Sequence, residues 1–289
     1  MRKPSSSEFD HCRELALRPG SVFEFTSRFL QVHKLEPLLA VYALKQAICT
    51  IPNRQVDDTI KWEKLKWWGE ELLADPGSPA RHPVLRALQI SGARSKLQDS
   101  LMLRLVSDAI MQIDSAPVAD ERAMFELFSV QGQSEIELEL ALDQVVIADQ
   151  SLGFLAGAST LFSSIESFAP GKHPQTQSLP LNLLAKFNVS SEDLGETGET
   201  GRLISVISEL ITLNIDWYNR GLSGLEVSSG AITNSSPAFH LQLRWAMEKR
   251  RLHRIGKDIP GFLQSGTRFG LADAWFAWRF VRKLAQQTG

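Results

Sequence analysis

The sequence predicts an all-α fold, built as one helical bundle. Apolar residues recur at spacings of three and four in successive windows, which is the period of amphipathic helices. Breaks that contain proline and glycine separate these windows, and no alternation of apolar and polar residues persists long enough for a sheet. With 289 residues, of which 43 % are hydrophobic, the chain can bury a large core in a single domain.

Composition limits the classes of partner and compartment. The formal net charge of −2 argues against nucleic-acid binding. The two cysteines, Cys12 and Cys49, give neither a disulfide framework nor a CxxC metal site. The chain shows no secretory signal, and its most apolar stretch, 152–165, is too short to span a bilayer. We therefore expect a cytoplasmic protein, with peripheral membrane contact left open.

A polar N-terminal stretch and a proline determine where the first predicted helices begin and end. Residues 1–20 are polar, and we expect a flexible N-terminal segment ahead of one helical domain over 21–289. Helical patterning begins near Ser21, and residues 35–48 form an apolar helix. Pro52 ends that helix because proline lacks the N–H that a continuing helix needs.

A second helix restarts after Asp57 and Asp58, which are good helix-start residues. Leu65, Trp68 and Leu72 then recur at i, i+3 and i+7 on one helical face. Later windows of the same kind predict further helices at about 83–94, 97–113, 121–150 (one helix or a broken pair), 151–168, 181–187, 203–222, 237–255 and 268–286.

Several short stretches resemble the squalene and phytoene synthase family. They are SRFL at 27–30, YAL at 42–44, KLKWWGEELL at 64–73, HPVLRAL at 82–88 and LPLNLLAKFNV at 179–189. Members of that family join two prenyl diphosphates head to head inside a one-domain helical bundle. The resemblance therefore implies an isoprenoid-synthase-like bundle around a central cavity.

The first metal-binding motif of that family is missing. The resemblance places two adjacent aspartates, and a third three residues later, after the tyrosine of the YAF-type stretch. Counting from Tyr42, these positions are Cys49, Thr50 and Asn53, and the usual arginine is Gln46. None of them can supply the carboxylate oxygens that Mg²⁺ prefers.

The second motif is also missing. The family places two aspartates four apart upstream of a Leu-Pro pair, and here they fall near Ser167 and Gly171. Glu166 is the only carboxylate in that stretch. Several Mg²⁺ ions are needed to neutralise two leaving diphosphates, and one glutamate cannot hold them. We therefore expect no catalytic or metal-binding residues and no cofactor.

This pattern favours a pseudoenzyme, with the scaffold kept and the chemistry lost. A subgroup of the family, the complex I assembly factors, shows the same loss, and the basic tail of this chain resembles its terminal part at Asp258 and Phe262. We interpret the chain as a non-catalytic protein that binds a lipid or isoprenoid, or that assembles a respiratory complex with a protein partner.

One alternative stays open: an active Mg²⁺-dependent prenyl synthase with displaced metal ligands. Asp57, Asp58, Glu63 and Glu166 would supply the carboxylates. This requires that the four side chains converge on one cavity.

Two further sets of residues are candidates for contact with a ligand or partner. The expected lining of the cavity is Tyr42, Gln46, Trp67, Trp68 and Glu166. The expected basic contact surface is Lys249, Arg250, Arg251, Arg254 and Lys257. The second set lies within residues 244–257, where six Lys and Arg face a single Glu and could touch anionic lipid or an acidic partner.

Overall fold

The predicted all-α fold is confirmed. The computed structural model describes residues 7–75, 78–114, 116–172, 179–190, 200–228 and 237–286, and these contain helices and connecting turns without a strand. Within those residues, no helix combines the length and the hydropathy needed to cross a bilayer.

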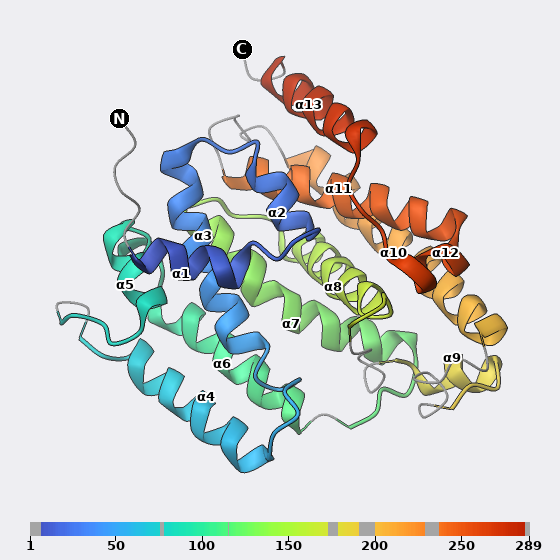
Figure 1. Cartoon of the computed structure of the whole chain (residues 1–289), viewed down its shortest axis with the longest axis horizontal. Helices are drawn as coiled ribbons and strands as arrows, with labels where there is room; N and C mark the ends of the chain where they lie inside the picture. The colour runs from blue at the N-terminus through green and yellow to red at the C-terminus, as the bar shows by residue number, and fades with distance from the viewer. Residues whose placement is uncertain are drawn as a thin grey trace.

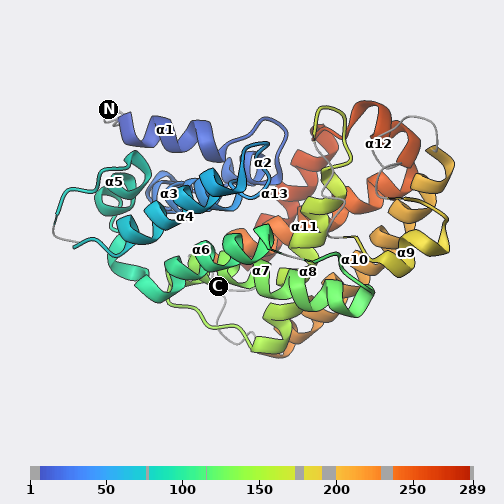
Figure 2. The ribbon, with the colours of Figure 1, turned by 90° about the horizontal axis from the view of Figure 1, so that it is seen from below.

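The helices follow the predicted order closely. They are α1 (Ser7–Ala16), α2 (Val22–Ser27), α3 (Val32–Cys49), α4 (Asp58–Leu72), α5 (Pro83–Ile90), the short 3₁₀ helix η1 (Arg94–Lys96), α6 (Asp99–Ile113), α7 (Glu121–Ala141), α8 (Asp149–Glu166), α9 (Leu181–Lys186), α10 (Thr200–Ser228), α11 (Pro237–Lys257), α12 (Ile259–Ser265) and α13 (Leu271–Gln286). Figures 1 and 2 show α1 and α3–α6 at one end of the molecule and α9–α12 at the other, with α7 and α8 between them.

The N-terminal segment corrects one prediction. Residues 7–16, expected to be flexible, form α1, while residues 1–6 lie outside the described residues. Phe9, Cys12 and Ala16 recur at i, i+3 and i+7 and are buried against α3 and α5. This apolar stripe fixes α1 on the N-terminal core, despite its polar composition.

The region expected to be one helix or a broken pair is a broken pair. Helix α7 ends at Ala141, and Gln144 adopts a positive φ of 58° in the connection to α8. The amide of Val145 donates to the carbonyl of Leu140 across this turn. A left-handed residue reverses the chain, so α8 runs back along α7.

Close approach of α7, α8 and α10 depends on three glycines. A Cβ at Gly132 would lie 2.4 Å from the Ala156 carbonyl oxygen, and one at Gly221 would lie 2.6 Å from Leu155 Cγ. One at Gly224 would lie 2.0 Å from Ser151 Oγ. A side chain at Gly132 would meet the backbone of α8 and force α7 away from it, whereas side chains at Gly221 and Gly224 would displace the side chains of Leu155 and Ser151.

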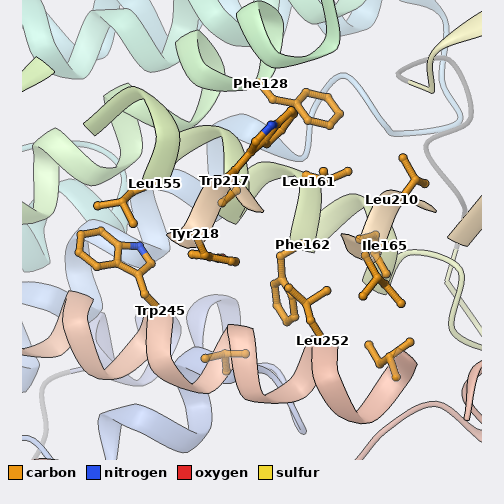
Figure 3. Close-up of a cluster of buried hydrophobic side chains, with 14 of the residues drawn as sticks. Phe128, Leu155, Leu161, Phe162, Ile165, Leu210, Trp217, Tyr218, Trp245 and Leu252 are labelled. Atoms are coloured by element: carbon orange, nitrogen blue, oxygen red, sulfur yellow. The ribbon is translucent and has the colours of Figure 1, made fainter. Parts of the chain in front are cut away.

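Large side chains fill the interior between these helices and α11. Figure 3 shows Phe162 and Ile165 of α8, Trp217 and Tyr218 of α10, and Trp245 of α11 pointing into a common apolar cluster. Each of the five is buried. The face of α8 that carries Phe162 and Ile165 is therefore packed solid, and any cavity must lie on another face.

Candidate ligand cavity

A cavity of about 1440 Å³ lies where the ends of several helices meet. Helices α2, α3, α6, α7, α8 and α11 and residues 265–274 line it. The wall includes the positions of both lost motifs: Cys49, Thr50, Asn53, Ser167 and Gly171. The positions inferred from the sequence thus meet at one cavity, although no carboxylate stands at any of them.

Both helices that lead into these motifs end where the motif would begin. Helix α3 ends at Cys49, and Asn53 follows in an exposed turn. Helix α8 ends at Glu166, with Ser167 as its C-cap, and Gly171 has a φ of 74°. Residues four apart share a face only within a helix, so neither pair of positions presents two side chains in parallel.

The carboxylates that line the cavity are engaged by neighbouring groups. Glu24 pairs with Arg28 of its own helix, and Glu135 pairs with Lys45 across the cavity wall. These pairs leave their carboxylates directed at cations of the protein, and they do not converge on a common point. No group of three possible metal ligands occurs among the described residues.

Glu166 lies in this cavity as expected from the sequence, and Arg251 neutralises it. The Nε atom of Arg251 is 2.6 Å from Oε1 of Glu166, and Lys172 Nζ is 3.6 Å from its other oxygen. The contact with Glu166 is one of charge, since Arg251 donates its hydrogen bonds to Thr267 Oγ1, to the Thr267 carbonyl and to the Gly20 carbonyl. The pair therefore ties α8 and α11 to two of the segments that border the cavity.

Asp108 is the cavity carboxylate with the most perturbed environment. It is 5 % exposed, and burial raises its pKa from 3.8 to about 6, although Ser134 Oγ donates to Oδ2 at 2.6 Å. The positive charge of Arg104 lowers the pKa of Asp108, whereas the negative charges of Glu135 and Glu137 raise it. Burial also raises the pKa of the Cys49 thiol, so this cysteine is protonated and weakly nucleophilic at neutral pH.

The alternative set of displaced metal ligands does not converge. Asp57 caps α4 by accepting from the amide of Thr59 at 2.8 Å, and Asp58 pairs with Lys61 at 2.7 Å. Glu63 lines a different hollow, while Glu166 lies in the cavity. The geometric condition for the displaced-ligand alternative is therefore not met.

Of the residues expected to line the cavity, Gln46 and Glu166 do so, and the other three lie elsewhere. Trp67 and Trp68 border a separate hollow of about 610 Å³ between α1, α3, α4 and α5. There Trp68 packs on His82, with ring centroids 4.6 Å apart. Helical periodicity places both tryptophans on α4 correctly, but it cannot say which hollow that helix borders.

Tyr42 is buried in a polar network rather than in the cavity wall. Its hydroxyl donates to Glu139 Oε2 at 2.9 Å and accepts from Arg244 at 2.9 Å. Beyond Glu139, the His240 ring bridges Glu139 Oε1 and Thr26 Oγ1, at 2.5 Å and 2.9 Å.

On the other side of Tyr42, Arg244 Nε donates to Glu248 Oε1 at 2.8 Å. Glu248 Oε2 in turn accepts from the hydroxyls of Tyr218 and Ser159. Every member of this chain of contacts is at most 6 % exposed. Because the buried charges are paired and hydrogen-bonded, we assign the network a structural role.

The basic contact surface expected on α11 is largely used inside the protein. Arg250 Nε pairs with Asp273 Oδ1 at 2.8 Å, Arg254 pairs with Asp273 Oδ2, and Arg251 is buried against Glu166. Lys249 donates to the side chain of Asn219 at 2.6 Å, and Lys257 is exposed. These arginines of α11 thus attach α13 to α11, because their side chains reach Asp273.

Sequence reasoning missed most of the cations around the cavity. Among the described residues, the cations on its wall are Arg18, Arg28, Lys45, Lys172, Arg251 and Arg268, and the carboxylates are Glu24, Asp108, Glu135 and Glu166. Cations therefore outnumber carboxylates. Their dispersal through the chain leaves no local pattern, although Arg28 stands within the SRFL stretch that carried the resemblance.

Comparison with known proteins agrees with this architecture. The squalene/phytoene synthase family matches residues 18–128. No curated protein matches the chain. The solved structure of a dehydrosqualene synthase in complex with ligand is similar with a TM-score of 0.69 and 14 % identity, covering 97 % of this chain and 96 % of that chain.

Squalene synthase HpnC from Alicyclobacillus acidocaldarius is similar with a TM-score of 0.62 and 17 % identity, covering 86 % of this chain and 93 % of that chain. At such identities the two structures establish a shared fold. The resemblance found in the sequence is thereby confirmed: residues 18–128 match the squalene/phytoene synthase family, and the chain shares the fold of the two solved structures.

Proposed function

We propose that the chain is a non-catalytic member of the squalene/phytoene synthase family and that it binds an anionic lipid or isoprenoid in the cavity without converting it. The observation that most directly supports this proposal is that α3 and α8 both end where the metal motifs would begin. Head-to-head prenyl transfer in this family depends on carboxylates held in pairs on those helices. The chain lacks both the carboxylates and the helical turns that would align them.

The charge of the wall supports an anionic ligand held directly by the protein. Arg18 and Arg268 are exposed and line the cavity, as do the paired Arg28 and Lys45. A guanidinium can hold a diphosphate through two parallel hydrogen bonds, without a bridging metal ion. The stacked rings of Phe25 and Phe269, 4.4 Å between centroids, offer an apolar contact for the start of a prenyl chain.

Binding and turnover of farnesyl diphosphate, with and without Mg²⁺, test this proposal. We expect binding that does not depend on Mg²⁺ and no release of diphosphate. Inorganic diphosphate should compete for the site, and farnesol should compete poorly, because the cations recognise the charged group. Release of diphosphate that requires Mg²⁺ would restore the synthase alternative, and absence of binding would reject the cavity as a ligand site.

A second function, assembly of a respiratory complex, is supported by the tail. Asp258 accepts from the amide of Gly261 at 2.9 Å and caps α12, and Phe262 is buried behind it. These are the two positions through which the tail resembles the complex I assembly subgroup. Deleting the gene in its host should reduce the amount of assembled complex I on a native gel, and an unchanged amount would reject this function.

A further inference from the structure

The outer face of α13 combines apolar and basic side chains in a continuous stripe. Leu271, Trp275, Trp278 and Arg282 follow one another at i, i+4, i+7 and i+11. Leu271 is 91 % exposed, Trp275 58 % and Trp278 47 %. Large apolar side chains exposed in a row, and not singly, mark a surface that contacts something else.

Basic residues flank the tryptophans on this face. The guanidinium of Arg279 lies 4.6 Å from the Trp275 ring, and that of Arg282 lies 4.6 Å from the Trp278 ring. Lys283 is exposed beside them. The one acidic residue of α13, Asp273, is buried on the opposite face.

The opposite face fixes α13 to the body of the protein. Asp273 pairs with two arginines of α11, and Ala277 is fully buried. Figure 1 shows α13 at the edge of the molecule, with α11 beside it. The stripe is thus held outward by a defined inner contact and is not a by-product of a loose tail.

We propose that this face of α13 binds the surface of a bilayer that contains anionic lipids. Tryptophan prefers the headgroup level of a membrane, and a neighbouring lysine or arginine is attracted by anionic lipid. The charge also disfavours a symmetric dimer through this face, because Arg279, Arg282 and Lys283 would meet their own copies.

Binding in this orientation would bring the cavity close to the lipid. Leu271 belongs both to the exposed stripe and to the cavity wall, and Ala274 on the next turn lines the cavity as well. The membrane contact is nevertheless a separate claim from the ligand of the cavity, because the stripe needs no occupant of the cavity to bind.

Co-flotation of the full chain with vesicles tests the proposal. One set contains phosphatidylcholine alone, and the other also contains phosphatidylglycerol. We expect binding to the second set, weakened by salt because the attraction is partly electrostatic. The double variant Arg279→Gln/Arg282→Gln should bind roughly 25-fold more weakly, at about fivefold per lost cation.

Matched variants distinguish binding through this face of α13 from the effect of losing any exposed tryptophan or any exposed positive charge. Trp275→Ala/Trp278→Ala should also lose binding, whereas Trp62→Ala, a 39 % exposed tryptophan on α4, should not. Lys66→Gln/Arg122→Gln removes the same charge from exposed sites on α4 and α7 and should leave binding intact. Far-UV circular dichroism confirms that each variant is folded.

Two outcomes would overturn the proposal. The first is no binding to the phosphatidylglycerol vesicles, and binding to soluble polyglutamate in that case would assign this face to an acidic protein. The second is equal binding of the α13 variants and the unmodified chain.

Discussion

Arg251 of α11 and Glu166 of α8 form an ion pair inside the cavity, with Nε 2.6 Å from Oε1. Their side chains are only 7 % and 13 % exposed. Glu166 occupies the end of the helix that would carry the second metal motif, so a cation of the protein sits beside that position.

Replacing Arg251 with methionine should therefore destabilise the protein. Glu166 would keep its charge without its main partner, and the Gly20 and Thr267 carbonyls would lose a donor. We expect a loss of about 3 kcal/mol in the free energy of unfolding, measured with urea. Arg251→Met/Glu166→Gln should lose less than the sum of the single changes. The 87 % exposed side chain of Arg122 provides the control, Arg122→Met, which should change little.

Asp108→Asn should stabilise the protein in a manner that depends on pH. The folded-state pKa of about 6 lies above the usual aspartate value of 3.8, so the folded protein binds the proton more tightly than the unfolded chain. The contribution of Asp108 to the free energy of unfolding therefore falls as pH rises between these two values, and it is constant at higher pH. Above pH 6, the ionised side chain costs up to roughly 3 kcal/mol, at about 1.4 kcal/mol per pKa unit.

The asparagine keeps an oxygen that can accept from Ser134 and does not ionise. Unfolding at pH 7 and at pH 3.5 measures the effect. The variant should be more stable than the unmodified chain at pH 7, and the difference should shrink toward zero at the lower pH. An equal difference at both pH values would show that the charge of Asp108 is not its cause.

Tyr42→Phe should reduce stability without changing binding in the cavity. The change removes a donor to Glu139 and an acceptor for Arg244, both of which stay buried. The expected loss is about 1 to 3 kcal/mol in urea unfolding. Farnesyl diphosphate affinity, measured on the same preparation, should stay the same, and a weaker affinity would place Tyr42 in the site.

Restoring the aspartates should not restore turnover. The variant Cys49→Asp/Thr50→Asp/Asn53→Asp/Ser167→Asp/Gly171→Asp supplies a carboxylate at every motif position, but α3 and α8 still end at Cys49 and Glu166. An aspartate at residue 171 would also be strained at a φ of 74°.

Diphosphate release with Mg²⁺ is the measurement for this variant, and we expect none above the unmodified chain. Mg²⁺-dependent turnover would show that the ends of α3 and α8 rearrange when the aspartates are present. A thermal scan with Mg²⁺ separates metal binding from turnover, because a bound ion raises the melting temperature even where no product forms.

Most of the fold could be predicted from local patterns. Pro52 and Asp57 predicted the break between α3 and α4, since a missing N–H and a capping carboxylate act within one turn. Helix α1 was missed because its composition is polar. The spacing of Phe9, Cys12 and Ala16 was the signal that could have found it.

The site was predictable only in part, because its chemistry depends on contacts between distant residues. The motif positions could be counted along the chain, and they do reach one cavity. Counting along the sequence could not identify the partner of Arg250 and Arg254. Asp273 lies beyond α12, and only the folded chain brings it to the two arginines. A basic run therefore looked like a free surface on α11, whereas an exposed basic face lies on α13.

The network around Tyr42 also bears on how the molecule comes apart. Tyr42 belongs to an apolar core of the N-terminal helices, and Trp245, beside Arg244 on α11, belongs to a second core. Glu139 and Arg244 join the two through directional bonds that fix their relative position, which apolar packing alone specifies less strictly. The two halves should consequently unfold in a single cooperative step, and a variant that cuts the network should let one half melt before the other.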